Sequence, residues 1–170
     1  KIRSVRSTDI VLEKAVSNYV GKAEFNVGIN KYDVNSSLID HNLGDQEKIT
    51  VEVTTLEKVL DDLLIKNIDL LCIDTEGTEI DVLEGLNFDK YQPKIILAEY
   101  NTISVANSKL IPYLLNKGYQ PIFINTWNII FSQDFEKDAI KCYKQESYMV
   151  NLKNILKQRI KFLIEMKEKI

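Results

Sequence analysis

The chain carries two kinds of apolar pattern, one alternating and one continuous. Apolar and polar residues alternate over residues 23–27 and 49–53, which predicts two half-buried strands. Residues 70–73 and 95–98 are continuously apolar, as in strands of a parallel sheet that is covered on both faces. Two further segments, 119–124 and 128–131, flank a polar Asn-Thr pair and predict a closing antiparallel hairpin.

Apolar residues at helical spacing predict four helices between and after these strands. Thr54 and Glu57 form a capping box for the first helix, and Thr78 and Asp81 form a second cap. The third helix covers residues 110–115 and ends at Gly118, and the fourth is a long amphipathic helix over residues 151–170. The buried faces of the first two helices are predicted to contain Leu56, Val59, Leu60, Leu63 and Leu64, and Ile80, Leu83 and Leu86.

Turn residues and polar stretches separate the remaining segments. An apolar segment over residues 10–16 and the strand at 23–27 are expected to form a hairpin or two neighbouring strands that turn at residues 20–22. Residues 30–47 are rich in Asn, Asp, Ser and Gly and predict a surface loop. Trp127 is expected to pack against the closing hairpin rather than to form a stacking platform for a sugar or base.

The predicted order of elements is β-β-loop-β-α-β-α-β-α-β-β-α. Strands that alternate with helices in the middle of the chain imply an α/β fold with a mostly parallel sheet. We expect one domain over residues 1–150, closed by the antiparallel C-terminal hairpin. The helix over residues 151–170 is expected to pack on this domain or on a second copy, which would form a homodimer.

Composition excludes several functional classes. A net charge of -3 over 170 residues gives no case for nucleic-acid binding. No apolar run is long enough for a membrane span or a signal peptide, and the first residue, Lys1, suggests a processed product or an excised piece. Cys72 lies in an apolar run and Cys142 is the second cysteine, so we expect free thiols in a reducing, cytoplasmic setting. The single histidine, His41, argues against a histidine cluster or a Cys-His zinc site.

Polar and acidic residues follow both continuous apolar strands. Asp74 ends the first strand, Glu76 and Glu79 follow in the turn and the next helix, and Glu99 and Asn101 end the neighbouring strand. Ligands of open parallel sheets bind at the carboxyl ends of the strands. We therefore predict a site with Asp74 and Glu76 in catalytic roles and with Glu79, Glu99 and Asn101 as substrate contacts.

Structural roles for the same acids stay open. Asp74 either receives a hydrogen bond or a proton from a substrate hydroxyl, or it satisfies backbone N–H groups of the turn. Glu76 and Glu79 either contact a substrate or, with Asp74, a divalent ion, or they place favourable charge at a helix N-terminus. No metal site is predicted.

The signature around these acids resembles a known family. The run Ile73-Asp74-Thr75-Glu76-Gly77-Thr78-Glu79, followed by Val82-Leu83-Glu84-Gly85, resembles the signature of FkbM-type methyltransferases. Further similar segments lie at residues 12–21, 36–38, 51–56 and 93–99, so that the resemblance covers about residues 9–101. Cys72 departs from the family, which has Lys at that position.

The resemblance implies the fold, the reaction and the cofactor. It implies a doubly wound, Rossmann-like sheet and S-adenosylmethionine-dependent methyl transfer to a hydroxyl, often on a sugar, glycan or natural product. By analogy, Ala15, Val16 and Ser17 would contact the cofactor. The Gly-rich turn of the family's first strand has no counterpart here, so we expect a partial doubly wound sheet that lacks its first two strands. Residues 70–74 would then have an open edge.

Two other functions are compatible with the sequence. Asp74-Thr75-Glu76-Gly77-Thr78 is similar to the nucleophile motif of haloacid-dehalogenase-type phosphatases, with Glu in place of the second Asp, and Asp134 and Asp138 form a downstream acidic pair. Alternatively, the chain is a non-catalytic binding or scaffold module that has kept part of the sheet and lost the cofactor loop.

Overall fold

The computed structural model describes residues 8–28, 36–39, 46–100, 109–125 and 127–134. The chain divides into two compact units, Lys1–Gln133 and Asp134–Ile170. The predicted helix over residues 151–170, the boundary at residue 150 and the homodimer through that helix lie outside the described residues. His41, Asn101, Asp138 and Cys142 lie outside them as well.

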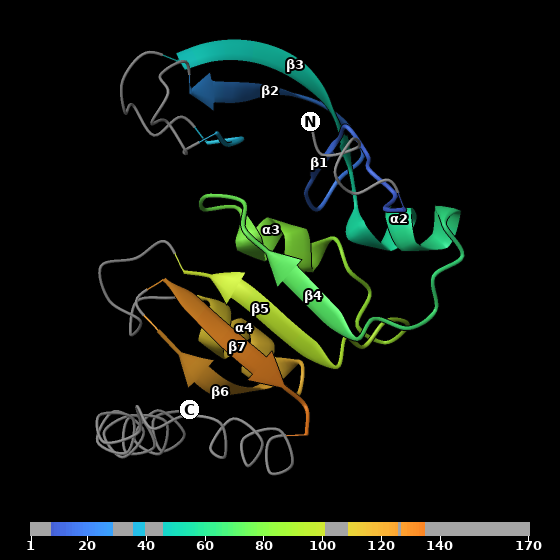
Figure 1. Cartoon of the computed structure of the whole chain (residues 1–170), viewed down its shortest axis with the longest axis vertical. Helices are drawn as coiled ribbons and strands as arrows, with labels where there is room; N and C mark the ends of the chain where they lie inside the picture. The colour runs from blue at the N-terminus through green and yellow to red at the C-terminus, as the bar shows by residue number, and fades with distance from the viewer. Residues whose placement is uncertain (1–7, 29–35, 40–45, 101–108, 126, 135–170) are drawn as a thin grey trace. The chain divides into compact units, whose positions relative to one another are not determined.

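A three-stranded sheet forms the first part of the described chain. It contains β1 (Ala15–Val16), β2 (Gly21–Gly28) and β3 (Gln46–Thr54) in the order β1-β3-β2. The strands β2 and β3 make the long antiparallel ribbon in Figure 1, and β1 lies parallel to the other edge of β3. The predicted pairing of residues 10–16 with 23–27 is therefore wrong. The backbone N–H of Ser17 donates to the Thr54 carbonyl at 2.9 Å, which keeps this segment on β3.

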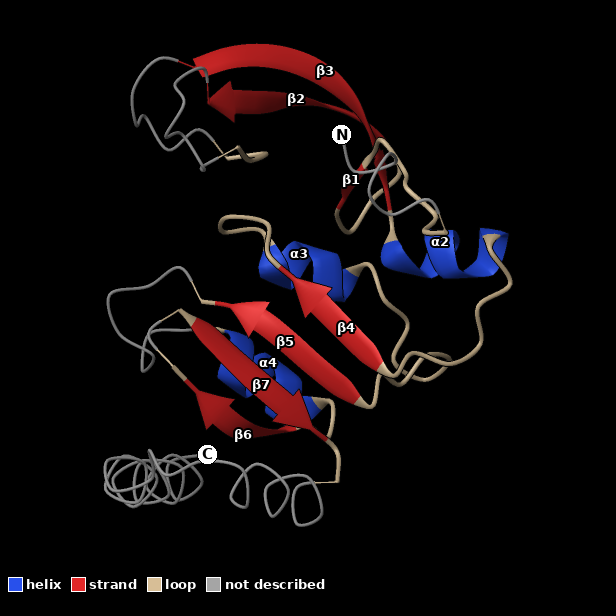
Figure 2. Cartoon of the chain, viewed as in Figure 1, coloured by secondary structure: helices blue, strands red, loops and turns tan. Residues whose placement is uncertain are grey.

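A four-stranded sheet contains β4 (Leu70–Ile73), β5 (Ile95–Glu99), β7 (Asn128–Ser132) and β6 (Gln120–Ile124), in that spatial order. β4 and β5 are parallel, and β7 is antiparallel to both β5 and β6, so the predicted closing hairpin is confirmed. The described chain is thus a mixed α/β structure with two small mixed sheets (Figure 2). The expected single, mostly parallel doubly wound sheet is wrong for these residues, because only β1–β3 and β4–β5 pair in parallel.

β4 is an edge strand of its sheet, in agreement with the open edge predicted for residues 70–74. It pairs with β5 on one side, and no other described strand pairs with it. The continuous apolar run predicted burial on both faces, but Leu70 is 59% exposed and Cys72 is exposed, while Ile73 is buried. The expectation of burial on both faces is therefore wrong, and Cys72 is not a core side chain.

The helix α2 (Leu56–Asp62) begins one residue later than the predicted capping box. Thr55 is the N-cap, and its Oγ1 accepts a hydrogen bond from the Lys58 N–H at 3.2 Å, whereas Thr54 is the buried last residue of β3. The helix ends before Leu64, which has a positive φ of 55° and is 84% exposed. Leu64 therefore does not belong to the buried face of the helix.

Two short helices complete the described part, α3 (Glu79–Glu84) and α4 (Leu110–Asn116). Gly118 follows α4 with a φ of +85°, and its N–H donates to the Leu115 carbonyl at 3.0 Å, which confirms the predicted C-terminal cap. Among the described residues, no helix is long and apolar enough to cross a membrane.

One hydrophobic core joins α2, α3 and α4 to the four-stranded sheet. Apolar residues of this core that are fully buried are Leu83, Ile96, Ala98, Leu114, Tyr119, Ile129 and Phe131. Tyr119 satisfies its hydroxyl by donating to the Pro93 carbonyl at 2.7 Å. This core fixes the positions of β4 and β5, which carry the acidic residues of the predicted site.

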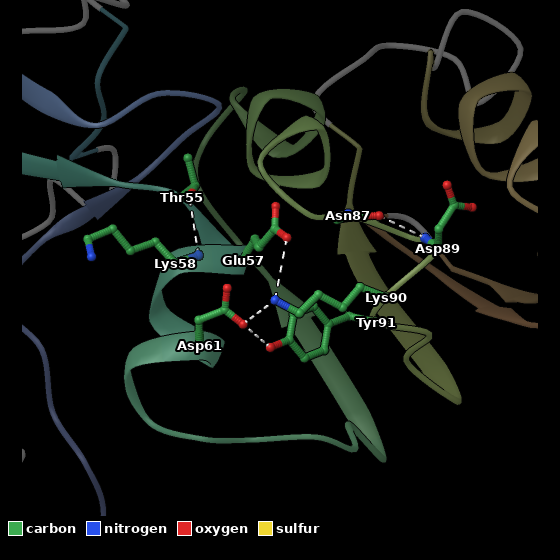
Figure 3. Close-up of polar contacts among 8 residues, drawn as sticks. All are labelled: Thr55, Glu57, Lys58, Asp61, Asn87, Asp89, Lys90 and Tyr91. Carbon is green, nitrogen blue, oxygen red and sulfur yellow. Dashed lines mark hydrogen bonds and ion pairs between the residues drawn. The ribbon is translucent and has the colours of Figure 1, made fainter.

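A surface network ties α2 to the segment before β5 (Figure 3). Lys90 and Tyr91 both donate to Oδ1 of Asp61, and Lys90 also lies 3.8 Å from Glu57. The hydrogen bond from Lys90 lowers the pKa of Asp61. A hollow of about 410 Å³ beside this network is lined by residues 61, 64–66, 90 and 91, none of which belongs to the predicted site.

Candidate functional site

The acidic signature forms a tight turn between β4 and α3. Asp74 follows the last residue of β4, and Glu76 and Gly77 both have positive φ, of 54° and 106°. A left-handed conformation is uncommon for a residue with a side chain, and it costs about 1 kcal/mol or more. Since Gly77 tolerates this conformation freely, the local strain is concentrated at Glu76.

The buried carboxylate of Glu79 organises this turn from inside. Glu79 is 5% exposed, and its Oε1 accepts hydrogen bonds from the Thr75 N–H at 3.1 Å, the Thr75 hydroxyl at 3.2 Å and the Gly77 N–H at 3.0 Å. Thr78 is the N-cap of α3, as predicted, but its side chain makes no capping hydrogen bond, so the predicted capping pair with Asp81 is not formed. The structure thus gives Glu79 a contact with the turn, and its predicted contact with substrate stays a prediction.

Ser37 reaches the same turn from a segment far away in the sequence. Its hydroxyl oxygen lies 3.3 Å from the Thr75 carbonyl oxygen and 3.2 Å from the Glu76 carbonyl oxygen. Ser37 is 1% exposed and pairs with Asn26 of β2. The sequence pointed to residues 36–38 through the family resemblance, but nothing in the local pattern indicates this contact.

Three carboxylates meet at the carboxyl ends of β4 and β5. The pairing of Ile73 with Ala98 brings the residues that follow them, Asp74 and Glu99, to the same edge of the sheet. One carboxylate oxygen each of Asp74, Glu76 and Glu99 lies within 4.8 Å of the others. The predicted grouping of these acids at one edge is therefore present, with Asp74 exposed and the other two partly buried.

The environment of Glu99 favours its protonated form. Burial, followed by a hydrogen bond with Asp74 and repulsion from Glu76, raises the pKa of Glu99 to about 7. Its Oε2 is buried and receives no hydrogen bond from the N–H and O–H groups of the described residues. Two carboxyl groups can share a hydrogen bond only when one holds a proton, so Glu99 can donate to Asp74 only in the molecules in which Glu99 is protonated.

The arrangement allows proton exchange and the binding of hydroxyl groups. Carboxylates accept hydrogen bonds from hydroxyls, and a carboxylic acid at Glu99 also donates one. Oxygen atoms at this spacing would suit a hard divalent cation as well. Acidic residues are also common at strand ends without an ion, so the cluster by itself assigns no metal.

The three residues predicted to contact the cofactor are only partly available to a ligand. Ala15 and Val16 form β1 and are half-buried, while Ser17 is 3% exposed. The Ser17 N–H is bonded to β3, and its carbonyl oxygen lies against Gly85. Ala15, Val16 and Ser17 therefore present little exposed surface, and their predicted contact with the cofactor stays a prediction.

Trp127 lies beside the carboxyl end of β5, where Glu99 is located. Its carbonyl oxygen accepts from the Tyr100 N–H at 2.9 Å, and the next residue, Asn128, pairs with Glu99. The turn is held by Asn125, whose Oδ1 accepts from the N–H groups of residues 127 and 128 at 2.9 and 2.7 Å. Trp127 is 64% exposed, so the expected packing of its side chain against the hairpin is wrong.

A mixed α/β domain with a strained acidic turn at a parallel strand end fits the methyltransferase class that the signature resembles. The model of the Methyltransferase FkbM domain matches residues 3–121, and the chain belongs to this family. No significant match was found among curated proteins or solved structures. The family assignment supports a methyltransferase in general and favours this function over the phosphatase alternative.

Proposed function

We propose that the chain carries the acceptor side of an S-adenosylmethionine-dependent O-methyltransferase that modifies a hydroxyl of a sugar, glycan or natural product. The observation that carries the proposal is the convergence of Asp74, Glu76 and Glu99 within 4.8 Å, in a chain of the FkbM family. S-adenosylmethionine is proposed as the methyl donor on the family assignment alone, with Ala15, Val16 and Ser17 on the cofactor side by analogy.

In this proposal, Asp74 and Glu76 act on the acceptor hydroxyl. Asp74 is exposed at the strand end, where a substrate can reach it, and its carboxylate receives the hydroxyl proton. Glu76 orients the acceptor oxygen from the turn. An oriented acceptor reacts faster because its rotational freedom is lost on binding rather than in the reaction.

Three further residues at or near the carboxyl end of β5 are proposed to contact other groups of the acceptor. Glu99, with a pKa of about 7, donates or accepts a hydrogen bond according to its protonation. The exposed indole of Trp127 offers an apolar face to a ring-shaped acceptor. Asn101 follows β5 two residues after Glu99 and is proposed as a further acceptor contact.

Methyl transfer by the native polypeptide that contains these residues tests the proposal. Formation of S-adenosylhomocysteine should require a hydroxylated acceptor and should be lost with the matching deoxy analogue. A parallel assay with p-nitrophenyl phosphate and Mg²⁺ addresses the phosphatase alternative. Mg²⁺-dependent phosphate release that is abolished by Asp74→Asn would overturn the methyltransferase proposal.

A non-catalytic binding or scaffold role is the second candidate, because Ala15 and Val16 are half-buried strand residues and Ser17 is 3% exposed, so these three residues offer little surface to a cofactor. Titration of S-adenosylmethionine and S-adenosylhomocysteine into the 170-residue chain is expected to show weak or no binding. Micromolar affinity would contradict the expectation of weak binding and would support a cofactor site within these 170 residues. Weak binding by the chain together with no transfer by the native polypeptide would support the binding role.

A further inference from the structure

Residues 36–39 bring a buried serine to the acidic turn. Ser37 exchanges backbone hydrogen bonds with Asn26 of β2, at 2.9 and 3.1 Å, and the Asn26 side-chain amide also donates to the Ser37 carbonyl at 3.3 Å. Both residues are buried, with exposed fractions of 1% for Ser37 and 4% for Asn26. The segment is therefore held firmly on the first sheet at this point.

The hydroxyl of Ser37 is placed to hold the carbonyl side of the turn. It lies 3.3 Å from the Thr75 oxygen and 3.2 Å from the Glu76 oxygen, and it accepts from the Ile39 N–H at 3.2 Å. Its single proton is shared between the two carbonyls or alternates between them. All three contacts are lost when the hydroxyl oxygen is removed.

Glu79 holds the opposite side of the same turn. Its carboxylate binds the N–H groups of Thr75 and Gly77, while Ser37 binds the carbonyls of Thr75 and Glu76. Rotation of the backbone at Glu76 out of its positive φ would move these peptide groups and break bonds on both sides. The two residues together therefore oppose relaxation of the strained turn.

We propose that Ser37 is a positioning residue that holds the Glu76 backbone in its left-handed conformation and thereby keeps the Glu76 carboxylate beside Asp74 and Glu99. Its part in methyl transfer rests on the function proposed above, whereas its effect on the position of Glu76 does not. Ser37 itself is buried and acts through the turn rather than on the acceptor.

The titration of Glu99 tests this positioning without any assay of activity. The 170-residue chain with ¹³C-labelled glutamate is titrated by NMR as the wild type and as Ser37→Ala, with Ser36→Ala as the matched control. Ser36 is the neighbouring serine, and its hydroxyl contacts the Gly28 N–H instead of the turn. We expect Ser37→Ala to lower the pKa of Glu99 by about half a unit, because Glu76 moves away, and Ser36→Ala to leave it unchanged.

The Glu76→Gln background separates positioning from a general loosening of the fold. Because Glu76 no longer carries charge there, Ser37→Ala should produce no further decrease in the Glu99 pKa. An equal decrease in both backgrounds, or no decrease in a folded Ser37→Ala chain, overturns the proposal. Ser37→Cys keeps a weak donor in a similar volume and should give an intermediate shift, so it serves if the alanine variant does not fold.

The consequence for catalysis is measured separately in the native polypeptide. Ser37→Ala is expected to lower kcat for methyl transfer about tenfold with a smaller change in KM, since the base and the orienting carboxylate are misaligned. A shifted Glu99 pKa with unchanged kcat would overturn the catalytic part of the proposal. Absence of transfer in the wild type would count against the proposed function and leave the NMR result valid.

Discussion

A Cβ atom on residue 85 would lie 2.2 Å from the carbonyl oxygen of Ser17. This contact is far shorter than van der Waals separation, so only glycine allows the end of α3 to rest against the end of β1. The Gly85 carbonyl also accepts a hydrogen bond from the Glu57 N–H at 2.9 Å. The glycine that ends the family signature therefore packs three elements together, two of which are distant in the sequence.

Gly85→Ala is expected to destabilise the chain by about 2–3 kcal/mol, because a backbone oxygen cannot move aside cheaply. Denaturant unfolding of the 170-residue chain measures the effect. Gly21→Ala is the control, since a Cβ there would lie 3.5 Å from the Tyr19 ring at an ordinary contact distance. Equal stabilities of the two variants would contradict the close approach of Ser17 and Gly85.

The acidic site could be predicted because its signal is local. Asp74 directly follows one apolar strand and Glu99 is the last residue of another, so their carboxylates lie at one edge whenever the two strands are parallel neighbours. The contribution of Ser37 could not be predicted in this way. Its contact with residues 75 and 76 spans 38 and 39 positions and depends on how the first sheet packs.

The sequence predicted the elements that pair with their neighbours along the chain. It predicted less well which strands are covered by other elements. The β6–β7 hairpin and the cap at Gly118 follow from turn residues that lie beside the elements they join. The apolar run over residues 70–73 predicted a covered strand, but β4 is an edge whose Leu70 is largely exposed. An apolar run shows that a strand can be buried. Whether it is buried depends on another element packing against it, which the run itself does not indicate.

Glu79→Ala is expected to cost about 2–3 kcal/mol of stability, because Thr75 and Gly77 lose the acceptor that satisfies their N–H groups. Thermal unfolding measures this cost. Glu84→Ala on the same helix is the control, since Glu84 is exposed and accepts only a surface hydrogen bond from the Asn18 side-chain amide. Unchanged stability with a raised KM for the acceptor would instead support the predicted substrate contact of Glu79.

Asp74→Asn is expected to lower kcat/KM for methyl transfer about 100-fold or more, because the amide cannot receive the hydroxyl proton. S-adenosylhomocysteine formation by the native polypeptide measures this loss. Asp69→Asn is the matched control at the other end of β4, where the carboxylate is 81% exposed and pairs with Lys94 at 2.6 Å. Similar losses in both variants would show that Asp74 has no special part in the reaction.

Trp127→Ala is expected to leave stability within about 0.5 kcal/mol of the wild type, since the side chain is 64% exposed. For a ring-shaped acceptor, KM should increase about fivefold through the loss of stacking. Trp127→Phe keeps an aromatic face and should restore most of the affinity. A lower melting temperature with unchanged KM would favour packing on the hairpin over contact with the acceptor.

Glu99→Gln is expected to remove a decrease in stability that the wild type shows as the pH rises. The pKa of Glu99 is about 7 in the folded chain, against its ordinary value of 4.5, so the folded state binds the proton more tightly than the unfolded state. The stability that this proton contributes to the wild type is fully present below pH 4.5 and is lost as the pH rises through 7.

Glutamine mimics the protonated acid at every pH. The free energy of unfolding of the variant, relative to that of the wild type, should therefore increase from pH 5 to pH 8. The difference should be on the order of 1 kcal/mol, after allowance for partial exposure to solvent. Urea unfolding of both chains at several pH values gives this difference directly. A constant difference across the pH range would mean that neither burial nor Asp74 and Glu76 perturb Glu99 in the folded chain.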